Sequence, residues 1–165
     1  MRIKSGLLSI LILSTISYSS GQSWQQCKTK INEGLHDIEI INDQVALAYG
    51  YGTGRLYKTK NGGRNWKKIY QFGKIYFEQI QFFGEEVGWI IGSPNHVFLT
   101  QNGGGKWTEI ELNDGKTKQD LYGMYFENPD TGYIAALEKG SEGYRTILYK
   151  TTNRGDTFKI VTTLN

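Results

Sequence analysis

Five side chains in glycine-rich segments have the chemistry to bind a ligand. Arginine and histidine donate hydrogen bonds to anions, and tyrosine rings offer flat faces to sugars or peptide side chains. These residues predict a basic and aromatic rim for binding. The alternative is that they are solvated loop residues beside flexible glycines. The candidates are Tyr51, Arg55, His96, Tyr144 and Arg145.

The elements that must position these side chains are marked by a repeated motif, Thr-x-Asn-x-Gly-x-x-aromatic, at residues 59–66, 100–107 and 151–158. A repeat of this period determines the architecture. Asn and Gly tolerate the positive φ of a tight hairpin, the Thr hydroxyl can bond to nearby amides, and the aromatic ring can pack between sheets. We therefore predict a structural role for the motif residues, which are Thr59, Asn61, Gly63, Trp66, Thr100, Asn102, Gly104, Trp107, Thr151, Asn153, Gly155 and Phe158.

Three apolar segments precede each motif and a fourth follows it. The first alternates with period two, and the second is almost continuously apolar (residues 45–49, 87–91 and 132–136), which indicates burial on both faces. Four antiparallel strands in about 40 residues form a β-propeller blade. The sequence thus predicts an all-β fold, a β-propeller-type repeat of four-stranded antiparallel blades at about 35–70, 75–112 and 120–161.

Three blades are fewer than the roughly four to eight of a closed propeller. The ring is therefore incomplete, or a divergent blade is hidden, or a homo-oligomer completes it. Within a blade, the turns after strands one and three lie at one end and the turn after strand two at the other. Because the motif follows strand three, the candidate segments 50–55, 92–96 and 138–145 are predicted at the opposite end.

The motif resembles the Asp-box, or bacterial neuraminidase repeat, with Asn in place of Asp in all three copies. Residues 87–107, with Val87-Gly88-Trp89 before the motif, are similar to a repeat of the photosystem II assembly and stability factor family and its bacterial relatives. The resemblance covers about residues 35–161 and implies a propeller. Repeats of this class occur in sialidases, xyloglucan-cleaving glycosidases, sorting receptors and assembly factors. We predict a non-catalytic module for protein–protein interaction or assembly, and the alternative is a carbohydrate-binding or sialidase-like glycosidase module.

A catalytic constellation is not evident in the sequence. A sialidase-like site needs an arginine cluster, but two of the four arginines beyond residue 21, Arg64 and Arg154, lie in the motif. Glu138 and Glu142 lie near the predicted rim, but their spacing does not distinguish a glycosidase pair. We therefore predict that the protein is not an enzyme and has neither a metal site nor a cofactor.

Residues 1–21 are predicted to be a signal peptide, with Arg2 and Lys4 before an apolar run and small residues after it. The domain would then be residues 22–165 of a secreted or periplasmic protein. The formal charge of +3 falls to +1 without Arg2 and Lys4, so charge does not indicate nucleic-acid binding. The predicted partner is a protein or a glycan, and no later segment is predicted to span a membrane.

The single cysteine, Cys27, excludes an internal disulfide. It is predicted to be a small, partly buried hydrophobic residue, with an intermolecular disulfide as the less favoured alternative. Residues 23–27 precede the first repeat as residues 66–70 precede the second. They are predicted to form a lone fourth strand of a blade that is otherwise missing, and the alternative is a linker.

Overall fold

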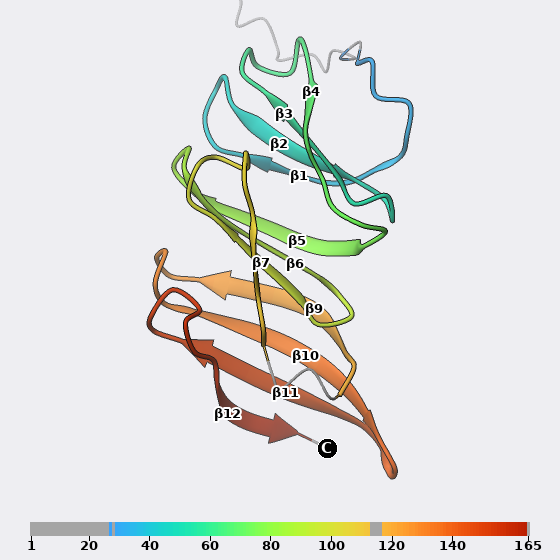
Figure 1. Cartoon of the computed structure of the whole chain (residues 1–165), viewed down its shortest axis with the longest axis vertical. Helices are drawn as coiled ribbons and strands as arrows, with labels where there is room; N and C mark the ends of the chain where they lie inside the picture. The colour runs from blue at the N-terminus through green and yellow to red at the C-terminus, as the bar shows by residue number, and fades with distance from the viewer. Residues whose placement is uncertain (1–26, 28, 113–116, 165) are drawn as a thin grey trace, which may run out of the picture.

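A computed structural model describes residue 27, residues 29–112 and residues 117–164. These residues form three stacked four-stranded sheets and no helix (Figure 1). The strands are β1 (Leu35–Ile40), β2 (Ala46–Gly50), β3 (Arg55–Thr59), β4 (Lys67–Gln71), β5 (Tyr76–Phe83), β6 (Val87–Ser93), β7 (His96–Thr100), β8 (Thr108–Ile110), β9 (Gln119–Phe126), β10 (Gly132–Gly140), β11 (Gly143–Thr151) and β12 (Lys159–Leu164).

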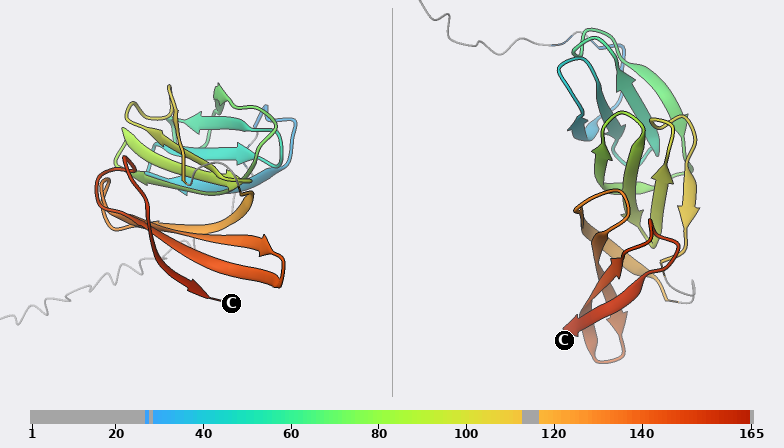
Figure 2. Two further views of the ribbon diagram at one scale, coloured as in Figure 1. Left: turned by 60° about the horizontal axis from the view of Figure 1, so that its bottom comes forward. Right: turned by 90° about the vertical axis from the view of Figure 1, so that its left-hand side faces the viewer.

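Each sheet is an antiparallel meander in which every strand pairs with its neighbour in sequence. The predicted all-β fold with four-stranded blades is confirmed. We name the sheets blade 1 (β1–β4), blade 2 (β5–β8) and blade 3 (β9–β12). The blades stack with their first strands side by side, since β1 contacts β5 and β5 contacts β9. They form an open arc and not a closed ring (Figure 2).

Two apolar clusters hold the stack together. Leu47, Tyr49 and Trp107 belong to the cluster between blades 1 and 2, and Trp89 stacks on Phe126 at 4.3 Å between blades 2 and 3. The continuous apolar runs of β2 and β6 are buried on both faces, as predicted. In β10, buried residues alternate with half-buried ones, because no further described blade covers its outer face.

The motif forms the turn between strands three and four of each blade, and its Thr is buried to about 99% in each copy. In blade 2, the Thr100 hydroxyl accepts hydrogen bonds from the amides of Gly104 (3.0 Å) and Asn102 (3.3 Å) and donates to Asn102 Oδ1 (3.1 Å). Asn102 Oδ1 also accepts from the amide of Lys106 at 2.8 Å. The Asn side chain thus supplies the oxygen that bonds the turn, which explains how it can replace Asp.

The other two copies repeat these contacts. Asn61 Oδ1 accepts from Asn65 N at 2.9 Å, and Asn153 Oδ1 accepts from Thr157 N at 3.1 Å. In the third copy, Arg154 has a positive φ of 55° at the position where Gly62 and Gly103 have φ values of 63° and 70°. The predicted structural role of the motif is consistent with this closed network of local bonds.

The aromatic residue of the motif has a different environment in each blade. Trp107 is 7% exposed, lies 5.7 Å from the Phe72 ring and 6.1 Å from the Phe82 ring, and donates from Nε1 to Gly104 O at 3.0 Å. It packs between sheets as predicted. Trp66 and Phe158 are only half-buried. The motif turns lie beside the turns between strands one and two, as the bond from Gly103 N to Glu86 O (2.8 Å) shows for blade 2.

The expectation that Cys27 is partly buried is wrong: the side chain is exposed and the residue is not in a strand. A Cβ added to Gly63 would nevertheless lie 3.4 Å from Cys27 Sγ. Ile69 and Ile110 approach Gly104 and Gly155 in the same way. Cys27 therefore takes the place of a fourth-strand residue against blade 1, but the described residues include no preceding sheet to cover it.

The predicted strand at 23–27 otherwise lies outside the described residues, as does the predicted signal peptide at 1–21. Both remain predictions. No helix in the described part of the chain has the length and hydrophobicity needed to cross a membrane.

Candidate functional site: a pocket between the inner strands

The first strand of every blade carries a β-bulge at the same place. The register shifts between Leu35 and Asp37 in β1, between Phe77 and Gln79 in β5, and opposite Ala135 and Ala136 in β9. Each shift leaves one residue of the first strand without a paired residue in the second strand. The extra residues are His36, Glu78 and Tyr122. Bulges redirect side chains and are common next to functional sites.

All three bulge residues line one pocket of about 310 Å³. We call the first strands β1, β5 and β9 the inner strands, and this pocket the inner-strand pocket. Each blade contributes to it, so the stacked arrangement of the blades creates it. Its lining residues are His36, Tyr51, Tyr76, Phe77, Glu78, Ser93, Asp120 and Tyr122.

Aromatic rings make up much of the pocket wall. The His36 ring stacks between Tyr49 and Tyr51, with ring centroids 5.6 Å apart in both pairs. Tyr51 in turn meets Tyr76 edge-on at 5.9 Å. Tyr51, Tyr76 and Tyr122 are 55–63% exposed, so their rings remain available to a ligand.

Two carboxylates, Glu78 and Asp120, face the same pocket. Neither forms an ion pair or a side-chain hydrogen bond with another described residue. The hydroxyl of Tyr49 is fully buried and also has no partner in the described part of the chain. Burial raises the pKa of Tyr49, and the charges of Asp37 and Glu78 raise it further.

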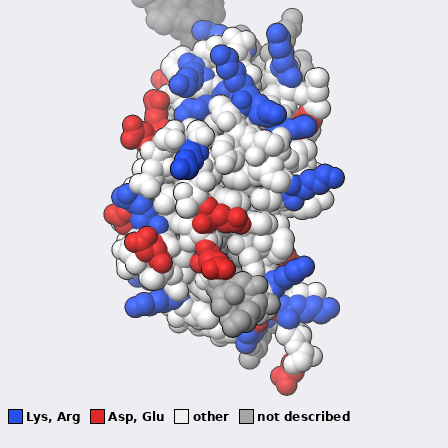
Figure 3. Space-filling view, in the orientation of Figure 1, with Lys and Arg blue, Asp and Glu red and all other residues white. Residues whose placement is uncertain are grey.

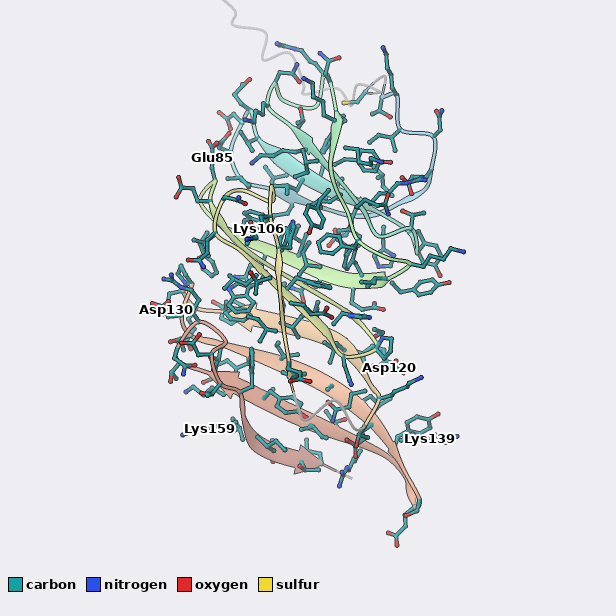
Figure 4. The ribbon with its side chains drawn as sticks, viewed as in Figure 1. Glu85, Lys106, Asp120, Asp130, Lys139 and Lys159 are labelled. Carbon is teal, nitrogen blue, oxygen red and sulfur yellow. The ribbon has the colours of Figure 1, made fainter. Side chains whose placement is uncertain are left out.

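The five residues predicted from sequence lie at one end of the strands, away from the motif turns. We call this the loop end. Figure 4 shows Asp120 and Lys139 on this side and Glu85 and Asp130 on the opposite side. The connections between strands two and three at this end are shorter than predicted. Two of them have only two residues each, 94–95 and 141–142. Four of the five candidates therefore belong to strands: Arg55, His96, Tyr144 and Arg145.

The five residues do not share one pocket. Tyr51 lines the inner-strand pocket. His96 lines a second pocket, of 480 Å³, and Tyr144 and Arg145 line a third, of 520 Å³. Arg55 lines none of these three. The proposed single rim is thus divided into separate surfaces.

Each of the three basic groups among them has an acidic partner, which lies in the same blade for His96 and Arg145 and just before β1 for Arg55. Arg55 Nη1 lies 3.3 Å from Glu33 Oε1, and His96 Nδ1 lies 2.7 Å from Glu109 Oε1. Arg145 pairs with Glu138, one of the two carboxylates considered for a glycosidase. These contacts compete with any anionic ligand for the same donors.

Glu138 belongs to a buried polar network. It is 6% exposed and accepts a hydrogen bond from Gln119 Nε2 at 2.7 Å, while Gln119 Oε1 accepts one from the Tyr149 hydroxyl at 3.0 Å. The Gln119 bond, followed by the contacts with Arg145, lowers the pKa of Glu138. A low pKa and a structural network fit a stabilising residue better than a general acid.

On the face drawn in Figure 3, Lys and Arg side chains gather over blade 1, with a few acidic side chains at its edges. Four lysines of this blade and its N-terminal approach, Lys30, Lys58, Lys60 and Lys67, line a pocket of 640 Å³ at the first motif turn, together with Trp66 and its neighbours. Lys58 is 9% exposed and its Nζ donates to Gly103 O at 3.1 Å, so it also joins blades 1 and 2. Burial lowers the pKa of this lysine.

Sequence reasoning identified Tyr51 but missed His36, Tyr76, Glu78, Asp120 and Tyr122. A signal was present in the spacing of apolar residues along the first strands. Leu35 and Ile38, Phe77 and Ile80, and Leu121 and Met124 are each three positions apart and not two or four. That interruption of the period-two pattern is what a bulge produces.

The fold and the motif turns define an Asp-box β-propeller stack. Comparison with known families makes this more specific: the chain matches the family model described as "Photosynthesis system II assembly factor YCF48" over residues 16–160. It therefore belongs to the YCF48 family of photosystem II assembly factor-like propellers.

Curated relatives and solved structures agree with this assignment. The chain is 30% identical over 145 residues to photosystem II stability/assembly factor HCF136 of Oryza sativa subsp. japonica, and 30% identical over 148 residues to that of Arabidopsis thaliana. Each alignment covers 82% of this chain but only 33% or 34% of the relative. The chain thus spans about a third of the length of these relatives.

Among solved structures, YCF48 bound to D1 peptide aligns with a TM-score of 0.66 and 18% identity over 86% of this chain and 44% of the other. YCF48 from Cyanidioschyzon merolae aligns with a TM-score of 0.65 and 22% identity, over 84% of this chain and 43% of the other. A GH74 xyloglucanase from Xanthomonas campestris aligns with a TM-score of 0.59 and 11% identity, over 72% of this chain and 19% of the other. These three likenesses show the shared propeller fold.

Proposed function

We propose that the protein is a non-catalytic binding module that holds a segment of a partner protein at its loop end, in an assembly role. The observation that supports this most directly is the inner-strand pocket, where side chains from three blades meet and leave aromatic rings and carboxylates free. A solved relative is described as YCF48 bound to D1 peptide. Family membership and the open pocket together favour a protein segment as the ligand.

Affinity capture from the native host, followed by variants of the pocket, tests this proposal. Tyr122→Ala should reduce recovery of the partner, because Tyr122 is 61% exposed in the pocket. Tyr125→Ala is the matched control, since Tyr125 lies on the same strand, is 64% exposed and does not line the pocket. Equal recovery with both variants would contradict binding at the inner-strand pocket.

The alternative is a carbohydrate-binding or glycosidase-like module, and the exposed tyrosines at the loop end are the observation in its favour. Retention on a xyloglucan or sialoglycan matrix that is abolished by Tyr51→Ala or Tyr144→Ala would support it. Absence of retention and of sugar release would contradict this alternative. Charge reversal at Arg55 or Arg145 is a poorer test, because it would set two carboxylates against each other in place of an ion pair.

We also propose that the protein is exported and that residues 1–21 are removed. The charged start, apolar run and small residues of that segment support this proposal. The intact mass of the protein recovered from the periplasm or medium of its host tests it. A mass that includes residues 1–21 would contradict it.

A further inference from the structure

We propose that the inner-strand pocket binds a basic side chain, arginine or lysine, of the partner segment. This inference rests on the proposed function, because it names the chemical group that the same site recognises. It follows from four features of the pocket: its aromatic wall, its unpaired carboxylates, its size and the buried hydroxyl beside it.

The aromatic wall provides faces for a cation. Ammonium and guanidinium groups are attracted to the faces of aromatic rings within about 6 Å of the ring centroid. The fold already contains contacts of this kind, with Lys150 Nζ 5.0 Å from the centre of the Tyr133 ring. In the pocket, the exposed rings of Tyr51, Tyr76 and Tyr122 have no such cation from the described chain.

The charged groups of the pocket complement a cation and not an anion. Glu78 and Asp120 line it, and no Lys or Arg does. Glu78 is half-buried and its carboxylate has no partner in the described chain. A guanidinium or ammonium group can donate to both carboxylates, and hydrogen bonds between charged partners are stronger than neutral ones. The basic residues Arg55 and Arg145, by contrast, are already paired.

The size of the pocket and the Tyr49 hydroxyl add two independent arguments. A volume of 310 Å³ is at the lower end of the range of about 300–1,000 Å³ for ligand pockets, which suits one side chain. Tyr49 contacts His36 and Phe77, which both line the pocket. Its buried hydroxyl lacks a partner within the described chain, so a polar group directly behind the pocket wall is left unsatisfied.

The first test is a titration followed by ¹H–¹⁵N NMR, with the acetylated and amidated peptide Gly-Ser-Arg-Ser-Gly as the probe. The matched probe has citrulline in place of arginine, which keeps the shape and removes the charge. The arginine peptide should shift resonances of β1, β5 and β9 at the loop end and bind about tenfold more tightly than the citrulline peptide. Equal binding of the two peptides, or shifts confined to another surface, would overturn the inference.

Variants then identify the groups responsible. Glu78→Gln and Asp120→Asn should each weaken binding of the arginine peptide about tenfold, and Tyr122→Ala about two- to fivefold. The controls are Glu86→Gln, Asp43→Asn and Tyr125→Ala, none of which alters a residue that lines the pocket. Unchanged affinity in both carboxylate variants would overturn the inference, provided that their amide spectra show the native fold.

The outcomes separate this inference from the proposed function. If the native partner is lost with Tyr122→Ala but binds equally to Glu78→Gln and Asp120→Asn, the site binds protein without recognising a basic side chain. If neither partner nor peptide depends on any pocket residue, both proposals fail. A xyloglucan oligosaccharide that shifts the pocket resonances while the arginine peptide does not would favour the glycan alternative and overturn the inference.

Discussion

Glu39 of β1 and Gln81 of β5 occupy the same position in successive inner strands and make the same contact with the next blade. Glu39 Oε1 accepts a hydrogen bond from Phe82 N at 2.8 Å, and Gln81 Oε1 accepts one from Phe126 N at 3.0 Å. Gln81 also donates from Nε2 to Phe126 O at 2.9 Å. A carboxylate cannot make that second bond, so blade 2 is tied to blade 3 by one more hydrogen bond at this position than blade 1 is to blade 2.

This relationship predicts that Glu39→Gln stabilises the protein. Burial raises the pKa of Glu39 above the ordinary 4.5, and the charge of Asp37 adds to this, while the Phe82 amide bond opposes it. Because the folded state then binds the proton more tightly than the unfolded state, the wild type loses stability as pH rises from 4.5 through the raised pKa.

The glutamine variant avoids this loss and can form the second bond, so we expect a gain of about 0.5–1.5 kcal/mol at pH 7. Urea denaturation at pH 7 and at pH 4 measures it, and the gain should shrink at the lower pH. Glu127→Gln, at an exposed position, is the control. A variant less stable than the wild type at pH 7 would contradict the prediction.

The repeated aromatic of the motif should differ in importance between blades. Trp107→Ala should lower the free energy of unfolding by about 3–5 kcal/mol, because it removes a nearly buried ring from the core between blades 1 and 2. Trp66→Ala should lower the free energy of unfolding by clearly less, since Trp66 is only half-buried. Chemical denaturation of both variants gives the comparison. Equal losses would show that Trp66 is as well covered as Trp107.

At the motif Thr, the hydroxyl should contribute more to stability than the shape of the side chain does. Thr100→Val keeps the volume but leaves the buried amide of Gly104 without its acceptor, which should cost about 1–3 kcal/mol. Thr100→Ser retains the hydroxyl and should cost less. Exposed Thr108 provides a control for the Thr→Val change itself. The explanation fails if Thr100→Val and Thr100→Ser lower the denaturation midpoint equally.

Acid sensitivity should depend on Glu138. Hydrogen bonding from Gln119 and pairing with Arg145 lower its pKa, so its contribution to stability is present above the unfolded value near 4.5 and is lost as pH falls through the lowered pKa. Glu138→Gln should therefore flatten the acid limb of a plot of stability against pH. Glu142→Gln changes an exposed neighbour and should leave the limb as in the wild type. An acid limb unaffected by Glu138→Gln would contradict this assignment.

The local features of the fold could be predicted from sequence because they depend on short-range chemistry. The motif turns and the buried second strands of blades 1 and 2 depend on neighbouring residues and appeared where expected. The first strands lie where expected, but their predicted alternation is wrong for β1, where Ile38 and Ile40 are both exposed, and it is interrupted by the bulges in β5 and β9. The inner-strand pocket could not be predicted in the same way, since His36, Glu78 and Tyr122 come together only through the stacking of the blades. Arg55, His96 and Arg145 were identified as basic groups, but their pairing with carboxylates depends on strand register.

The contact between Glu39 or Gln81 and the following inner strand gives the stack a polarity. In both contacts a side-chain oxygen of one blade accepts from the backbone of the blade that follows it in sequence. In β9 the equivalent position is Tyr125, which lies opposite Tyr133 as Gln81 lies opposite Trp89. A phenol cannot reproduce the paired acceptor and donor of the Gln81 amide. Any molecule that packs against the outer face of blade 3 therefore meets a different chemical surface from the one that joins these three blades.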